Sequence, residues 1–298
     1  MNPPSLVCLG HAALDHVWHV EAFPSAPTKT PATAYRMQGG GMAFNAAVAA
    51  ARLGSAVRFV GRVGDDAAGS FLHDRLVAEG IDAGALQRTT GRSTSVSAVV
   101  VDGRGQRQIF NHRGDALLHA APLDPALLDG AALVLVDPRW PDGAEAALRW
   151  ARRRGVPSML DADIAPTEDL QRLVPLADWA AFSEPGLACW APDLDRETAL
   201  RQAVAQGARR ALVTLGEHGS LRTAGGALLA CPAPRVRSRD TTGAGDVFHG
   251  ALASALAEGL DEEAAVQRAS AAAAFKCQRG MGALGAPTRA ELLAWMAR

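Results

Sequence analysis

Lysine, tyrosine and cysteine are scarce in this chain of 298 residues. Lysine occurs only at Lys29 and Lys276, so 28 of the 30 lysine and arginine side chains are arginine. No Gly-Lys-Ser or Gly-Lys-Thr triplet is present, which excludes a phosphate loop of the Walker type. The four cysteines lack the C-x-x-C spacing of zinc or redox sites and predict reduced thiols in a cytoplasmic protein.

Long apolar runs and excess charge of one sign are also absent. No apolar run approaches the roughly 18 residues of a membrane helix. The N-terminus shows neither the basic segment nor the apolar core of a secretory signal. The formal net charge is -1, so no global field favours nucleic acid or an anionic membrane. We therefore expect neither as a partner.

Short segments rich in β-formers alternate with helical patterns along most of the chain. This alternation predicts a mainly parallel sheet covered by helices on both faces. The expected strands are 5–10, 56–63, 131–137, 158–161, 179–182 and 210–214. The expected helices are 42–53, 66–79, 142–153, 167–173, 196–206, 246–258, 261–278 and 288–297. The alanine-rich helix at 42–53 is apolar nearly all round, so we expect it to be buried.

Two segments interrupt the alternation. Residues 17–35 contain three prolines between short β-like pieces, and residues 93–111 have the pattern of a hairpin that turns at 102–105. Neither segment has a helix to cover it. Together they predict a small β-sheet that projects from the main body.

The most informative stretch is Asp-Thr-Thr-Gly-Ala-Gly-Asp at 240–246, which leads directly into an apolar helix. The free N–H groups at a helix N-terminus bind anions, and Gly243 and Gly245 let the backbone approach one closely. Asp246 adds a proton acceptor beside that anion. This combination suits phosphoryl transfer to an alcohol. For a bare Gly-x-Gly-Asp, an ordinary capped helix is an equally good interpretation.

That string resembles the C-terminal signature of the ribokinase / phosphofructokinase-B superfamily of carbohydrate kinases. The segment 39–54, Gly-Gly-Gly-Met-Ala-Phe-Asn followed by an alanine-rich helix, resembles the family's N-terminal motif. The resemblance covers essentially the whole chain. It implies one three-layer α/β/α domain over 1–298, with lid segments at about 16–38 and 93–112 that cover the sugar and join a homodimer. It also implies ATP and Mg²⁺ as cofactors.

The resemblance assigns roles to particular residues. Asp246 would be the catalytic base, which we expect to be ionised at neutral pH, and Gly243, Ala244 and Gly245 would form the anion hole. Asp15, Gly40, Gly41 and Asn45 would contact the sugar. Thr214, Gly216 and Gly219 would line the nucleotide, and residues near 273–277 would flank adenine. Simpler structural roles remain open: a turn for Asp15, a cap for Asn45, and a plain turn for 214–219.

One departure concerns the metal. After the expected strand at 179–182 the family carries an N-x-x-E motif that helps to organise Mg²⁺ and phosphate. This chain has Ser183-Glu184-Pro185-Gly186 instead. Either Glu184 substitutes through water or it only faces solvent, and Asp161 and Asp163 are further candidates, so the metal ligands are left undetermined.

The sugar is a further question. Lys29, Asn111 and Arg139 match a Lys, an Asn and an Arg that hold the sulfonate of 6-deoxy-6-sulfofructose in the bacterial sulfofructose kinase branch, which this chain resembles most. Two positive charges and an amide suit a tetrahedral anion. The alternative is a solvated Lys29, an Arg139 paired with Asp137 or Asp142, and fructose, ribose or 2-keto-3-deoxygluconate as acceptor. Asn45 is more typical of the wider family.

We expect an ATP-dependent kinase that phosphorylates a ketose hydroxyl. A sugar-binding regulatory pseudokinase is the non-enzymatic alternative, supported only by the altered 183–186 segment. A nucleoside kinase would need a base-stacking aromatic residue, and aromatic residues make up only 5% of the chain.

Overall fold

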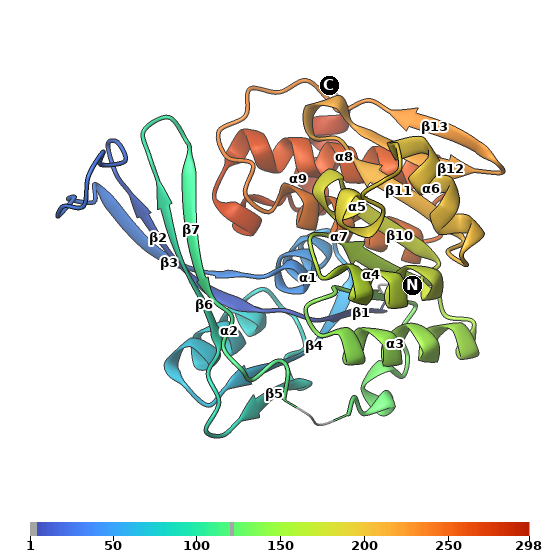
Figure 1. Ribbon diagram of the computed structural model, residues 1–298, viewed down its shortest axis with the longest axis horizontal. Coiled ribbons are helices and arrows are strands. Elements are labelled where there is room, and N and C mark those ends of the chain that lie inside the picture. Colours follow the sequence, from blue (N-terminus) through green and yellow to red (C-terminus); the bar gives the residue numbers. More distant parts are fainter. Residues whose placement is uncertain (1–4, 120–121, 298) are drawn as a thin grey trace.

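A computed structural model describes residues 5–119 and 122–297, and within them the chain forms two β-sheets. The large sheet has nine strands in the order β13-β12-β11-β10-β9-β8-β1-β4-β5 (Figure 1). Its strands are β1 Ser5–Leu9, β4 Ala56–Gly64, β5 Leu86–Thr89, β8 Leu133–Val136, β9 Ser158–Ala162, β10 Trp179–Ser183, β11 Arg210–Thr214, β12 Ser220–Ala224 and β13 Ala227–Cys231. Within the described residues, β12 alone runs against the other strands, through its antiparallel pairings with β11 and β13, so the predicted mainly parallel sheet is confirmed.

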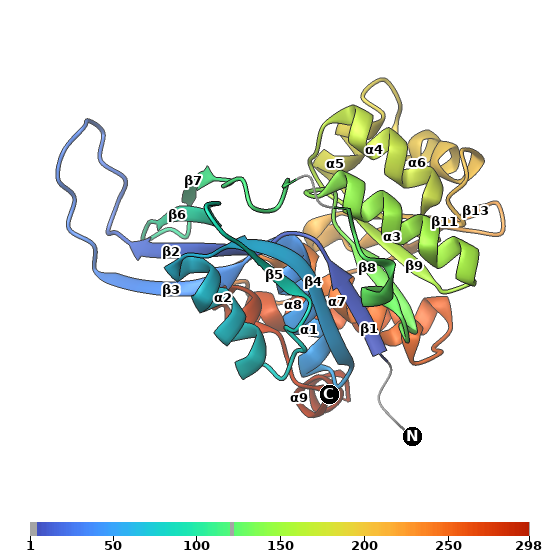
Figure 2. The same ribbon diagram turned by 90° about the horizontal axis from the view of Figure 1, so that it is seen from below.

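Helices cover both faces of this sheet (Figure 2). Alternate strand residues explain the two layers, since Leu6 and Cys8 point into one apolar core and Val7 and Leu9 into the other. The first layer contains α1 Met42–Arg52, α2 Ala67–Ala78, α7 Ala244–Ala257, α8 Glu262–Arg279 and α9 Arg289–Met296. The second contains α3 Pro141–Arg154, α4 Thr167–Leu173, α5 Glu184–Trp190 and α6 Arg196–Ala205.

The small sheet has the order β3-β2-β6-β7 and projects from the main body (Figures 1 and 2). It contains β2 Ala13–His19, β3 Ala34–Gly40, β6 Ser95–Val101 and β7 Arg107–His112. The strand pairing places Asp15, Ser97 and Asn111 side by side on one face. His16, Trp18 and Tyr35 stack on the opposite face.

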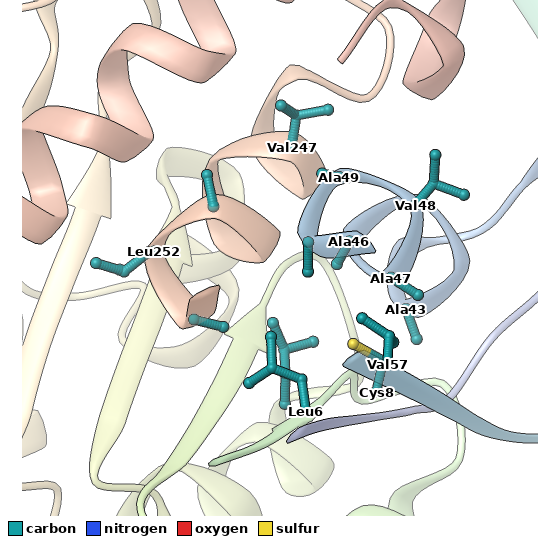
Figure 3. Close-up of a cluster of buried hydrophobic side chains, with 14 of the residues drawn as sticks. Leu6, Cys8, Ala43, Ala46, Ala47, Val48, Ala49, Val57, Val247 and Leu252 are labelled. Atoms are coloured by element: carbon teal, nitrogen blue, oxygen red, sulfur yellow. The ribbon is translucent and has the colours of Figure 1, made fainter. Parts of the chain in front are cut away.

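Helices α1 and α7 pack unusually closely because small residues lie between them. A Cβ on Gly250 of α7 would lie 2.2 Å from the carbonyl oxygen of Ala46 in α1. Figure 3 shows Ala43 and Ala47 of α1 directed toward Cys8 and Val57 of the sheet, and Ala46 beside α7. This close packing brings the N-terminal turns of the two helices together.

The main body differs from the sequence prediction at four places. Helix α7 begins at Ala244, two residues before the predicted start, because Gly243 adopts a left-handed conformation at the N-cap. Strand β5, helix α5 and the β12–β13 hairpin were not predicted, because each of these helices and strands is only four to seven residues long. Within the described residues, none of the helices is long and apolar enough to cross a membrane.

Candidate active site

Two helices of the first layer begin at glycines. The N-caps of α1 and α7 are Gly41 and Gly243, both with positive φ (98° and 74°) and neither with a side chain that could cap the helix. By contrast, side-chain oxygens cap α2, α5, α6, α8 and α9. The two glycine starts therefore leave backbone N–H groups to be satisfied by something else.

At the start of α7, some of these backbone N–H groups have no acceptor among the described residues. The N–H of Ala244 donates to the Thr241 carbonyl at 3.1 Å, and that of Val247 to the Gly243 carbonyl at 3.0 Å. Between them, the N–H groups of Gly245 and Asp246 have no acceptor among the described residues. The open N-terminus of a 14-residue helix is suited to hold a phosphate.

At the start of α1, a side chain of the protein itself accepts a backbone N–H group. Asp137, which follows β8 and is fully buried, accepts N–H bonds from His11 at 2.7 Å, Arg139 at 2.9 Å and Ala43 at 3.1 Å. Burial raises the pKa of Asp137 to about 6 despite these three bonds. Ala43 lies in the first turn of α1, so one N–H of this helix start is already satisfied within the chain.

Asn45 and Asp246 join the two helix starts. Asn45 Nδ2 donates to Asp246 Oδ2 at 2.7 Å, which leaves Asp246 Oδ1 for another partner. The other amide atom, Asn45 Oδ1, is buried and has no partner among the described residues. Asn45 is therefore not a backbone cap, the simpler alternative for it.

The acidity of Asp246 differs from the sequence expectation. Burial, together with the nearby Asp161 carboxylate, raises the pKa of Asp246 to about 8 and outweighs the Asn45 amide. We expected an ionised carboxylate at neutral pH from the helix dipole alone. Desolvation and a like charge are stronger effects than one helix terminus.

A buried histidine lies behind this carboxylate. His249 Nδ1 is 3.0 Å from Asp161 Oδ2, an ion-pair distance, although the two atoms do not form a hydrogen bond. Burial alone would lower the pKa of His249, but the carboxylates of Asp161 and Asp246 raise it. An imidazolium here would offset the negative charge around Asp246.

A cavity of about 690 Å³ opens on the α7 side. Thr214, Gly216 and Gly219 line one wall, and Ala244 and Gly245 line the end nearest to Asp246. Ala273, Ala274 and Cys277 of α8 complete it, in the region that we expected to flank adenine. One cavity is thus lined by the three predicted nucleotide residues and by two of the three predicted anion-hole residues, while Gly243 is not part of its lining.

A second cavity of about 600 Å³ lies under the small sheet. Its lining combines Met42 and His11 near the start of α1 with Ser97 and Asn111 of the small sheet, and with Arg113 and Arg139. Neither guanidinium forms a hydrogen bond or an ion pair with the described residues. Asp142, an alternative partner of Arg139, pairs with Arg172 instead. Burial, reinforced by Arg139 and Arg113, lowers the pKa of His11 to about 4, so this histidine is neutral.

The remaining acceptor-site predictions have mixed outcomes. Asp15 is not itself part of the lining of the second cavity, although its neighbour Ser97 is, and burial raises the pKa of Asp15. Gly40 gives Asp15 its space, because a Cβ there would lie 2.2 Å from Asp15 Oδ2. Lys29 lies on the exposed loop between β2 and β3 and lines neither cavity. Asn111 lines the second, but its Nδ2 already faces Ser97 Oγ at 3.1 Å.

The altered 183–186 segment has a structural explanation. Ser183 caps α5 and donates to Asp163, while Glu184 pairs with Arg196 at the surface. A Cβ on Gly186 would lie 2.0 Å from the carbonyl oxygen of Ala162, so a glutamate cannot occupy that position in this backbone. Of the two possibilities for Glu184, the structure favours the solvent-facing one.

Sequence reasoning missed four residues that shape this site: Arg107, Arg113, Asp137 and His249. From β7, Arg107 reaches the hydroxyl groups of Thr241 (3.2 Å) and Thr242 (2.9 Å) beside the start of α7. Asp137 carried a usable signal, because it ends a predicted buried strand. Arg107 and Arg113 carried no such signal, because nothing in the sequence distinguishes them from the other arginines among the 28 of this chain.

The comparisons with known proteins agree with this architecture. The sequence pattern of the pfkB family carbohydrate kinases matches residues 3–289, and the chain belongs to this family. It is 29% identical to a ribokinase of Bacillus subtilis (strain 168), over 97% of this chain and 98% of that protein. It is 31% identical to a fructokinase of Klebsiella pneumoniae, over 86% and 88%.

A solved structure extends the likeness to three dimensions. The ribokinase of Arabidopsis thaliana, complexed with ribose and ATP, superposes with a TM-score of 0.83 at 25% identity, over the whole of both chains. The ribokinase-like fold expected from the sequence is thus confirmed. Because these relatives are named ribokinases and fructokinases, the resemblance to the sulfofructose kinase branch stays a prediction.

Proposed function

We propose that this carbohydrate kinase transfers the γ-phosphoryl group of ATP to a hydroxyl group of a sugar held beside Asp246. One observation carries the proposal: two cavities end at the two helix starts that the Asn45–Asp246 bond joins. Ala244 and Gly245 close one cavity, and His11 and Met42 line the other. Donor and acceptor would therefore meet at Asp246.

The residues of the chain suggest how the transfer proceeds. Asp246 acts in its ionised form: Asn45 holds Oδ2, and Oδ1 orients the acceptor hydroxyl and takes its proton as the new O–P bond forms. The N–H groups of Gly245 and Asp246 stabilise the charge that spreads over the transferred phosphoryl group. ADP leaves with the electron pair of the broken O–P bond.

Mg²⁺ fits this site as a partner of the phosphates. No cluster of three or more potential ligands that could hold a metal ion alone occurs in residues 5–119 and 122–297. Mg²⁺ is commonly held by one or two carboxylates, by water and by substrate phosphates. Asp161 and Asp163, at the end of β9 and just after it, are the carboxylates that would take this part, and the ion would neutralise phosphate charge.

The unpaired arginines favour an anionic acceptor. Two guanidinium groups without carboxylate partners, Arg139 half-buried and Arg113 exposed, line the acceptor cavity. A sulfonate such as that of 6-deoxy-6-sulfofructose, or the carboxylate of 2-keto-3-deoxygluconate, would pair with them. In this proposal Arg113 takes the part that we expected of Lys29. The named relatives favour the second candidate, a neutral ribose or fructose.

A substrate panel separates these candidates. ATP consumption would be measured with sulfofructose, fructose, ribose, fructose phosphates and 2-keto-3-deoxygluconate, using the native protein and the variants Arg139→Ala, Arg113→Ala and Arg153→Ala. The last removes an exposed arginine of α3 and controls for net charge. We expect Arg139→Ala to raise KM at least about tenfold for the anionic sugar only. An equal effect on neutral sugars would exclude the anionic acceptor.

Two further expectations concern the whole molecule. We propose a homodimer in which the outer face of the small sheet, where Tyr35, Met37 and Phe110 are about half exposed or more, packs against a second copy. Light scattering of the native protein and of Phe110→Glu tests it, and a native monomer would contradict it. The four free cysteines are consistent with the proposed cytoplasmic location.

A further inference from the structure

One ammonium group is completely buried beside the phosphate-binding loop. Lys276 is one of only two lysines in the chain, and its side chain is 0% exposed in the last turns of α8. Its Nζ donates to the backbone carbonyl of Asp240 at 2.8 Å and lies 3.7 Å from Asp240 Oδ2. Lysine is almost never fully buried unless it is paired, so this placement requires a reason.

Asp240 transmits this contact to the start of α7. Its Oδ1 accepts the N–H of Thr242 at 2.8 Å, and its Oδ2 accepts that of Gly282 at 3.0 Å. Burial alone would raise the pKa of Asp240, but Lys276 and these N–H donors lower it, so the carboxylate is ionised. The chain from Thr242 to Gly245 then forms the open turn that we assign to the phosphate.

The neighbouring contacts tie the same loop to the end of α8. The N–H groups of Arg239 and Asp240 donate to the Cys277 carbonyl at 2.8 and 3.3 Å. The loop thus rests on two consecutive residues of one helix. Only one of these two attachments carries a charge.

We propose that the Lys276 ammonium is a fixed internal cation that positions the 240–245 loop, and through it the Gly245 and Asp246 N–H groups, for the transferred phosphoryl group. The inference rests on the proposed phosphoryl transfer and names a positioning residue for it. The carbonyl and Oδ2 oxygens of Asp240 both lie within 3.7 Å of Lys276 Nζ, and two oxygens held in one buried place repel each other unless a cation offsets their charge. Because the chain supplies this cation, the reaction needs no monovalent cation from solution.

Lys276→Met tests the proposal with a side chain of similar length and no charge. Lys29→Met is the matched control, because it removes the only other lysine, which is exposed. We expect kcat of Lys276→Met to fall at least about tenfold, while KM for the sugar stays within about twofold. Ammonium or methylammonium chloride should restore part of that kcat, and tetramethylammonium chloride, which has no N–H donor, should not.

The native protein provides a second arm that does not depend on how the variant folds. Its kcat should be the same in sodium, potassium and tetramethylammonium chloride. The proposal is overturned by a native protein that requires an added small cation, by Lys276→Met with native kcat, or by a folded Lys276→Met whose loss no small cation relieves. Failure of the proposed function looks different: the native protein would consume ATP with none of the sugars.

Discussion

The starts of α1 and α7 resemble each other in sequence and differ in what they can bind. Each follows a glycine-rich turn, begins at a glycine with positive φ and continues as an apolar helix rich in alanine. In α1, the buried Asp137 carboxylate takes the Ala43 N–H. In α7, the N–H groups of Gly245 and Asp246 remain without an acceptor among the described residues.

The comparison shows that a glycine-rich helix start is not by itself an anion site. An internal carboxylate already fills the position at α1, where a second anion would meet like charge. The α1 start therefore serves to place Asn45 and the acceptor cavity, and the α7 start receives the phosphate. Four predictions test this division of roles, in order of decreasing expected effect.

The largest effect should come from Asp246→Asn at the α7 start. Loss of the proton acceptor should lower kcat by about 10²–10⁴-fold, because general base catalysis contributes that much. ATP affinity, measured by calorimetry, should change little, since the backbone N–H groups remain. Asp193→Asn, an exposed aspartate, is the control. A variant with full activity would remove Asp246 as the base.

Asp137→Ala should be the most damaging change at the α1 start. Three N–H groups would lose their acceptor, and each buried donor left unpaired costs about 1–3 kcal/mol, so the free energy of unfolding should fall by at least about 3 kcal/mol. Urea denaturation measures this. Asp178→Ala is a control outside the site, because Asp178 accepts bonds from Ser158. An Asp137→Ala protein that keeps the native free energy of unfolding would contradict this role of Asp137.

Gly243→Ala should weaken stability and activity together. Its φ of 74° is unfavourable for alanine by about 1–2 kcal/mol. The new Cβ would also lie 3.4 Å from Asn45 Nδ2. Gly259→Ala has a similar φ of 83° and no atom within 4 Å, so it should lose the same stability but no activity. Equal kinetics for the two variants would show that the α7 start binds no substrate.

The smallest effect should appear in the pH dependence of stability. Because the pKa of Asp246 is raised to about 8 in the folded protein, the folded chain binds more protons than the unfolded chain between about pH 4 and 8. Folding at this site therefore becomes less favourable as the pH rises. Asp246→Asn should melt about 2–4 °C above the native protein at pH 8, with a smaller gap at pH 5. Scanning fluorimetry measures it, and a constant gap would contradict the raised pKa.

The sequence was sufficient for the sheet, most of its helices and the loop at 240–246. Alternating patterns of period 2 and 3.6 depend on local chemistry, so strands such as 179–182 and helices such as 261–278 could be predicted within a few residues. The cationic lining of the acceptor cavity could not. We predicted that Lys29 and Arg139 would supply the positive charge of this cavity. Lys29 lies on an exposed loop outside it, and Arg113 is part of the lining instead.

The amino-acid sequence by itself determined which backbone segments can approach an anion, because glycine adopts the positive φ at 41 and 243 at the least cost, and only glycine fits the close contact at 250. Tertiary structure alone decided which of the two helix starts stays open, how acidic Asp246 is, and that Lys276 is buried beside Asp240. These properties depend on desolvation and on pairs of charges that are distant in the chain, such as Asp161 with Asp246 and Asp240 with Lys276. A local sequence pattern shows neither the desolvation nor the pairing.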